Sequence, residues 1–124
     1  MKLKSKSKLI EEPVFKFSVL VLLCPREQIS TKIKKHGIPD MEDFAESTAG
    51  NQGLTAFHSE LRTAVVWVMA ANAERLTAKE TAALAHELMH VSFHYLDDIG
   101  MKLTEESEEA FTYLTEHLIT EVLS

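Results

Sequence analysis

The segment from Thr77 to Asp98 constrains this chain most, because it is predicted to be a helix that is apolar around most of its circumference. Thr77 and Glu80 have the spacing of a capping box at its start, and Gly100 supplies the left-handed residue that commonly follows a helix end. Such a helix belongs in the centre of a protein. The large apolar residues on its two flanks are Leu84, Leu88, Val91 and Tyr95 on one side, and Ala85, Met89, Phe93 and Leu96 on the other.

The polar stripe of this helix contains the pentapeptide His86-Glu87-Leu88-Met89-His90, an H-E-x-x-H pattern. Residues four apart project from the same helix face, so His86 and His90 can bind one Zn²⁺ together. Glu87 stands beside them, where a carboxylate can act as general base toward a metal-bound water. The pattern therefore predicts a zinc site with His86 and His90 as metal ligands and Glu87 as the catalytic residue.

A catalytic zinc needs a third protein ligand. His94 continues the same face, but it lies about 12 Å along the axis from His86, too far for one ion while the helix stays regular. The metzincin pattern is also excluded, because Phe93 and Leu96 stand where its Gly and third His belong. A second predicted helix, with Thr104 as N-cap and an end near Val122, offers carboxylates instead: Glu105, Glu106, Glu108 and Glu109.

At this point the chain resembles the gluzincins, the zincin metallopeptidases whose third ligand is a Glu on a following helix. Their aminopeptidase-like members have eighteen residues between the second His and that Glu, and the same spacing leads from His90 to Glu109. The stretch from Glu109 to Tyr113 is also similar to the Glu-small-Phe sequence of those enzymes. The resemblance implies Glu109 as third ligand, with Glu108 as the alternative.

The resemblance further implies a single minimal zincin-like domain over residues 1–124, of the kind found in short bacterial or phage-encoded H-E-x-x-H proteins. The expected fold class is α+β, a short mixed or antiparallel sheet packed on the central helix. The implied function is that of a zinc-dependent metallopeptidase with a peptide or protein substrate, in which Glu87 assists attack by a zinc-bound water. Candidates for stabilising the oxyanion or orienting a ligand are Tyr113, His94 and His58.

Two other functions stay open. One is a non-catalytic regulatory or phage-associated binding protein that retains a zincin-type metal site. The other is a purely structural metal site, which would have a fourth protein ligand in place of an exchangeable water.

The rest of the chain supplies the expected sheet and its connections. Residues 1–12 are predicted to be a flexible basic tail, and residues 38–53 a long loop with one helical turn near Glu42 to Glu46, either a functional lid or a disordered segment. One edge of the expected sheet is a candidate for pairing with an extended peptide, either the strand directly before the central helix or its neighbour. The predicted strands are Val14–Leu23, Leu54–His58 and Thr63–Met69, with a short helix over Pro25–Lys35.

Composition limits the partners and the compartment. The net charge of −6 argues against nucleic acid as the main partner, because phosphate binding needs clustered cations. The run before Cys24 is too short to span a bilayer, which argues against a membrane protein. Cys24 is the single cysteine, as in proteins of a reducing compartment, and its apolar neighbours predict a buried thiol. These features predict a cytoplasmic protein.

Overall fold

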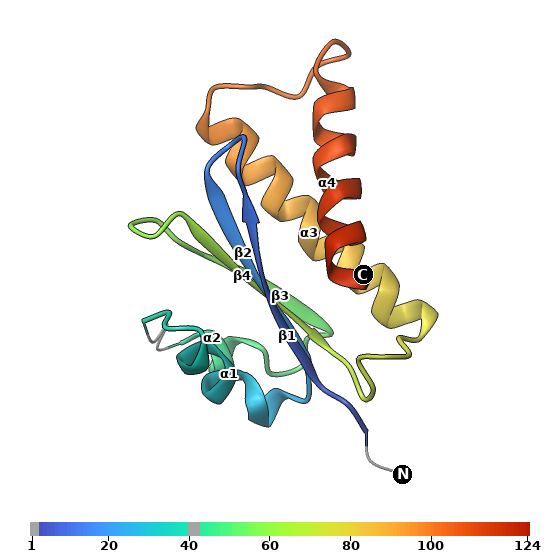
Figure 1. Cartoon of the computed structure of the whole chain (residues 1–124). Coiled ribbons are helices and arrows are strands. Elements are labelled where there is room, and N and C mark those ends of the chain that lie inside the picture. Colours follow the sequence, from blue (N-terminus) through green and yellow to red (C-terminus); the bar gives the residue numbers. More distant parts are fainter. Residues whose placement is uncertain (1–2, 40–42) are drawn as a thin grey trace.

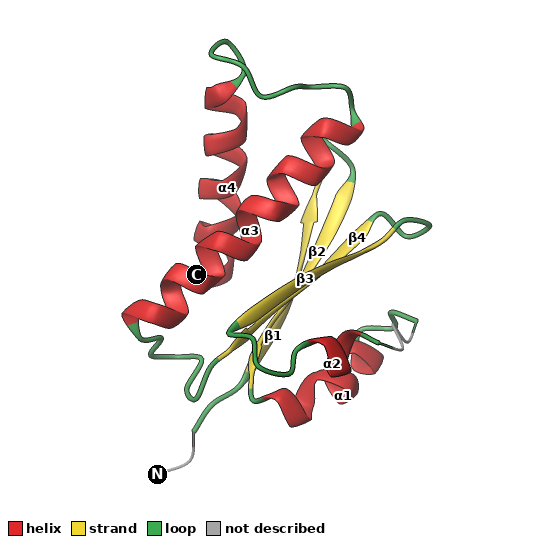
Figure 2. Ribbon diagram, turned by 180° about the vertical axis from the view of Figure 1, so that it is seen from behind, coloured by secondary structure: helices red, strands yellow, loops and turns green. Residues whose placement is uncertain are grey.

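A four-stranded sheet lies between two helical layers in the computed structural model, which describes residues 3–39 and 43–124. Figures 1 and 2 show α3 (Ala78–Asp98) and α4 (Glu108–Leu123) on one face of the sheet and the short helices α1 (Ile29–Lys35) and α2 (Phe44–Ser47) on the other. A single turn of 3-10 helix, η1 (Arg26–Gln28), precedes α1. The expected α+β class is confirmed. Within the described residues, no helix is both long and apolar enough to cross a membrane.

The sheet is mixed, and its strand order is β1-β2-β4-β3. The central pair β2 and β4 is parallel, whereas β1 and β3 are antiparallel edge strands beside them. β3 and β4 are also consecutive strands of the hairpin that directly precedes α3. The strands are β1 (Lys6–Glu12), β2 (Phe17–Cys24), β3 (Gly53–His58) and β4 (Thr63–Met69).

Two separate cores explain why β2 is a nearly continuous apolar run. Val19 and Val21 face α3 and α4, while Leu20 and Leu22 face the α1 and α2 layer. A strand buried on both faces lacks the polar alternation of a half-exposed strand. Cys24 closes this run and is fully buried, as predicted, and its burial raises the pKa of the thiol to about 11.

From Lys6 on, the N-terminal segment is not a flexible tail, because Lys6–Glu12 forms β1 and pairs with residues 17–23 of β2. Ile10 is buried in the core below α3 and α4. The ammonium groups of Lys6 and Lys8 donate hydrogen bonds to the carbonyl oxygens of Val122 and Glu121 at the end of α4. Two lysines of the predicted basic tail, Lys6 and Lys8, are thus anchored at a helix C-terminus, which favours cations. Residues 1–2 lie outside the described residues.

The described part of the long loop contributes buried residues to the second core. Ile38 and Phe44 are buried with the outer face of β2 and β4, and Thr48 is buried beside them. The expected helical turn is present as α2, Phe44–Ser47, while Asp40–Glu42 lie outside the described residues. Because α2 is on the sheet face away from α3, this helical part of the loop does not lie over the histidines (Figure 2).

The two long helices, α3 and α4, begin in different ways. In α3 both hydrogen bonds of the predicted capping box between Thr77 and Glu80 are present, and Gly100 follows with a φ of +83°. For α4 the prediction of Thr104 as N-cap is wrong, because the N-cap is Ser107. Thr104 and Ser107 instead close a turn through their hydroxyl groups and backbone amides. The turn delays the helix, so that Glu108 and Glu109 and not the two preceding glutamates occupy its first turn.

Candidate metal centre

The two histidines of the H-E-x-x-H pattern converge on one point at the surface of α3. Nε2 of His86 and Nε2 of His90 are 3.2 Å apart, and both side chains are exposed. Two Zn–N bonds of about 2.0–2.1 Å at a tetrahedral angle would separate two nitrogens by about 3.3 Å. The pair therefore has the spacing of two ligands on one zinc ion, and its donor atoms are of a kind that zinc prefers.

Glu87 points away from solvent, between α3 and the edge strand β3. Its side chain is only 11% exposed, and Oγ1 of Thr55 donates a 2.8 Å hydrogen bond to its Oε1. The other carboxylate oxygen, Oε2, lies 4.0 Å from Nε2 of His86. A neutral hydroxyl thus fixes the carboxylate beside the histidine pair without neutralising its charge.

Gly53 makes this position of Glu87 possible. A Cβ at residue 53 would lie 3.1 Å from Cγ and 3.3 Å from Oε2 of Glu87, and 3.0 Å from the carbonyl oxygen of Trp67. Any larger residue would therefore push against the carboxylate and against β4. Gly53 and Thr55 alternate with residues on the other face of β3, so both face α3.

Sequence reasoning missed Gly53 and Thr55. Both belong to an edge strand more than thirty residues before Glu87, and neither stands in a recognisable motif. The signal that remains is weak: a glycine at the start of a predicted strand often marks a close approach of another group.

The third ligand is not gathered with the histidines. Across residues 3–39 and 43–124, no group of three or more His, Cys, Asp or Glu side chains is arranged to hold a metal ion. Glu109 is exposed in the first turn of α4, and at 100° per residue it lies on the side of that helix opposite the buried Phe111 and Leu114. The structure thus brings together His86, Glu87 and His90 and leaves the carboxylate of α4 apart from them.

Glu108 occupies a different position from Glu109. It lines a groove of about 710 Å³ between α3 and α4, which also contains Met89, the residue directly before His90. Glu109 is not among the residues that line this groove. Of the two candidates for third ligand, Glu108 is therefore on the side of α4 that faces α3. The spacing of the gluzincins, in contrast, favours Glu109.

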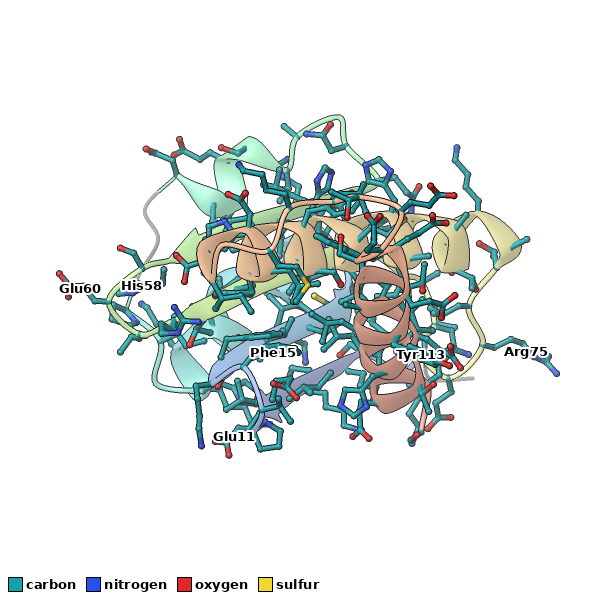
Figure 3. All side chains as sticks on the ribbon, turned by 90° about the horizontal axis from the view of Figure 1, so that it is seen from above. Glu11, Phe15, His58, Glu60, Arg75 and Tyr113 are labelled. Atoms are coloured by element: carbon teal, nitrogen blue, oxygen red, sulfur yellow. The ribbon has the colours of Figure 1, made fainter. Side chains whose placement is uncertain are left out.

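The candidate oxyanion or ligand-orienting residues are dispersed. His94 stacks its ring on Phe57 of β3, with 3.7 Å between ring centroids. Nδ1 of His58 accepts a hydrogen bond from the backbone amide of Leu61 in the hairpin turn. Tyr113 is 65% exposed on α4. Figure 3 shows His58 at the tip of the β3–β4 hairpin and Tyr113 toward the opposite side of the molecule, so these two do not serve one position together.

The central helix is less enclosed than its apolar circumference predicts. Leu84, Leu88 and Val91 are fully buried, but Met89 and Phe93 are 45% and 39% exposed. The second apolar flank of α3 is thus covered by α4 only in part, and what is left open is the groove.

Comparisons with known proteins identify no relative of this chain. No protein-family model matches this chain, and no curated protein and no solved structure is significantly similar to it. The site must therefore be interpreted from its own chemistry.

Proposed function

We propose that this protein is a zinc-dependent metallopeptidase that hydrolyses peptide bonds. The observation that carries the proposal is the arrangement of His86, Glu87 and His90 on α3. Two imidazole nitrogens 3.2 Å apart are adjacent to a carboxylate that is held by a hydrogen bond from β3. This set offers two of the nitrogen ligands that a catalytic zinc uses and a carboxylate beside them that can act as general base.

His86 and His90 would hold the zinc ion. The proposed third ligand is a carboxylate from the first turn of α4, which would have to approach the histidines, because the structure leaves it apart from them. Glu109 is favoured by its spacing from His90, and Glu108 by its place on the groove. Zinc, when bound, supplies a Lewis acid for the scissile carbonyl and for water. Glu87 takes a proton from the attacking water and passes it to the leaving amine, as a general base that becomes a general acid.

The peptide substrate would pair with the outer edge of β3. Of the two strands before α3, β4 is enclosed between β2 and β3, so only β3 has backbone groups available on its outer side. β3 also holds Thr55 and Gly53 against Glu87. An extended chain added to this edge would run beside the carboxylate, in the manner of β-strand addition.

Metal content and proteolysis together test the proposal. Protein purified with zinc present should carry about one zinc ion per chain, measured by mass spectrometry of the metal, and His86→Ala should lose it. Glu87→Gln should retain the zinc and cleave fluorescent casein at least about a hundredfold more slowly than the wild type. Glu109→Ala and Glu108→Ala, compared side by side, identify the third ligand by their loss of zinc.

His117→Ala is the matched control, because His117 is an exposed histidine on α4 outside the proposed set. It should keep both zinc and activity. A wild-type protein that stays free of metal in zinc-replete medium would contradict the proposal, as would a Glu87→Gln variant that cleaves at the wild-type rate.

The alternative function is a non-catalytic regulatory or phage-associated binding protein. The observation in its favour is the open groove with exposed Met89 and Phe93, a surface that can bind a partner without any metal. Under this alternative, Glu87→Gln would leave the biological activity unchanged.

A further inference from the structure

The groove between α3 and α4 is an apolar surface beside the candidate metal centre. Its volume of about 710 Å³ lies within the range of about 300–1,000 Å³ typical of ligand sites. Met89 and Phe93 of α3 form one wall, and Leu103 of the connecting loop, 58% exposed, lies at its end. Phe111 of α4 closes the floor against Phe93, at 5.5 Å between ring centroids. Figure 1 shows how the C-terminal part of α3 and the N-terminal part of α4 diverge here.

The rim of the groove is acidic. Glu105, Glu108 and Glu116 line it, and none of the described residues that line it is Lys or Arg. A smaller hollow of about 400 Å³ shares three residues with the groove and adds His94, Asp97 and Met101. An apolar floor under an uncompensated negative rim is complementary to a ligand that has both apolar groups and positive charges.

The groove lies across α3 from the carboxylate of the candidate site. Glu87 is turned toward β3, while Met89 is turned toward α4. The histidine pair lies on the exposed face between these two directions. A polypeptide that crosses His86 and His90 therefore has β3 on one side and the groove on the other.

We infer that this groove binds apolar side chains of a polypeptide that also carries Lys or Arg, and that it selects such basic, apolar segments as substrates. The selection of substrates rests on the proposed function, whereas the binding of such a segment needs neither zinc nor catalysis. A second copy of this chain is disfavoured as the occupant, because a symmetric contact through the groove would bring the two acidic rims together.

Peptide binding to the full chain with the Glu87→Gln substitution tests the inference without cleavage of the probe. Three fluorescein-labelled peptides of equal length are compared by anisotropy: one that alternates Leu and Lys, one with Ser in place of Leu, and one with Glu in place of Lys. The Leu-Lys peptide should bind at least about tenfold more tightly than either of the others. Equal affinities for the three peptides would overturn the inference.

Charge reversal then locates the binding on the groove. Glu105→Lys/Glu116→Lys should weaken binding of the Leu-Lys peptide about tenfold and strengthen binding of the Leu-Glu peptide. Glu46→Lys/Glu60→Lys is the matched control, since it changes the net charge equally at exposed residues of α2 and of the hairpin turn. If both double variants change the peptide affinity equally, the peptide responds only to the net charge of the protein, and the groove is excluded as its binding site.

Thr112→Arg provides a second test, because it obstructs the groove and places a cation within one helical turn of Glu108 and Glu116. Thr112 is exposed on α4 and lines the groove, so a long cationic side chain would occupy the floor while remaining compatible with a helix. Binding of the Leu-Lys peptide should be lost, with an unchanged circular dichroism spectrum. A wild-type chain that sediments as a dimer, and becomes monomeric on Thr112→Arg, would assign the groove to a second copy and overturn the inference.

The two proposals fail in different ways. Tight binding of the Leu-Lys peptide by a wild-type chain that cleaves nothing would refute the peptidase and leave the groove's specificity intact. Cleavage of casein with no preference among the three peptides would refute the groove's role and leave the peptidase intact.

Discussion

Thr55 on the edge strand β3 donates a 2.8 Å hydrogen bond from Oγ1 to Oε1 of Glu87 on α3. This contact links the sheet edge to the glutamate of the H-E-x-x-H pattern. It orients the carboxylate of Glu87, which is a buried residue. In the proposed peptidase Thr55 is therefore a positioning residue, which acts through Glu87.

Thr55→Val should lower kcat about tenfold or more, because a hydrogen bond to a charged group contributes about 1.5–3 kcal/mol. KM and the zinc content should stay close to those of the wild type. Thr55→Ser restores the hydroxyl and should restore most of kcat. A Thr55→Val variant with full activity, or a Thr55→Ser variant as slow as Thr55→Val, would show that the hydroxyl does not position Glu87.

Gly53→Ala should reduce the free energy of unfolding by about 1–3 kcal/mol, as overpacking does in a closely packed site. The added Cβ would meet Glu87 and the carbonyl oxygen of Trp67 at 3.0–3.3 Å. Urea unfolding of a double-mutant cycle with Glu87→Ala measures how much of the cost comes from the carboxylate. A smaller cost in the Glu87→Ala background is expected, and identical costs would mean that only the Trp67 contact matters.

Lys6→Met/Lys8→Met should lower the free energy of unfolding by about 1–2 kcal/mol. The two ammonium groups satisfy carbonyl oxygens at the end of α4, and cations at a helix C-terminus are also favoured by its dipole. Lys4→Met is the control, because the Lys4 ammonium lies in an exposed 4.0 Å contact with Glu74 and not at the end of α4. If the double variant and the control unfold at the same urea concentration, the lysines do not anchor α4.

Stability should fall as the pH rises above about 9, through the buried thiol. Burial raises the pKa of Cys24 from 9.0 to about 11, so the unfolded chain loses this proton before the folded chain does. The stabilisation is complete below pH 9 and is lost progressively as the pH approaches 11, by up to about 1.4 kcal/mol per pH unit. Tyr95 adds a second loss between pH 10 and about 12, because burial raises the pKa of its phenol.

Cys24→Ala isolates the first of these losses. In urea titrations at a series of pH values, the variant should begin to lose stability only near pH 10, where Tyr95 starts to contribute. Parallel curves for wild type and variant between pH 9 and 10 would refute the contribution of the thiol.

The local sequence determined those helices and strands whose ends and faces are set by residues only a few positions apart. The capping box at Thr77 and the left-handed Gly100 bound α3 as predicted, and Thr63–Met69 is β4 to the residue. The histidine pair was predictable in the same way, since a helix places residues four apart on one face whatever surrounds it. These features depend on backbone hydrogen bonds and side-chain periods that are set locally.

Only the tertiary structure decided which distant groups meet. Lys6 and Lys8 lie in a strand because β2 offers a free edge and α4 offers carbonyl oxygens more than a hundred residues away. Thr55 and Gly53 reach Glu87 because β3 lies at the sheet edge beside α3, which no local pattern encodes. The direction of each glutamate on α4 likewise follows from which stripe of that helix is buried and from the turn at Ser107 that sets its start. The period of a sequence predicts which face of a helix or strand is apolar, but tertiary packing determines the partner that this face contacts. Burial of apolar surface is favourable against any complementary surface, so the period does not identify the partner.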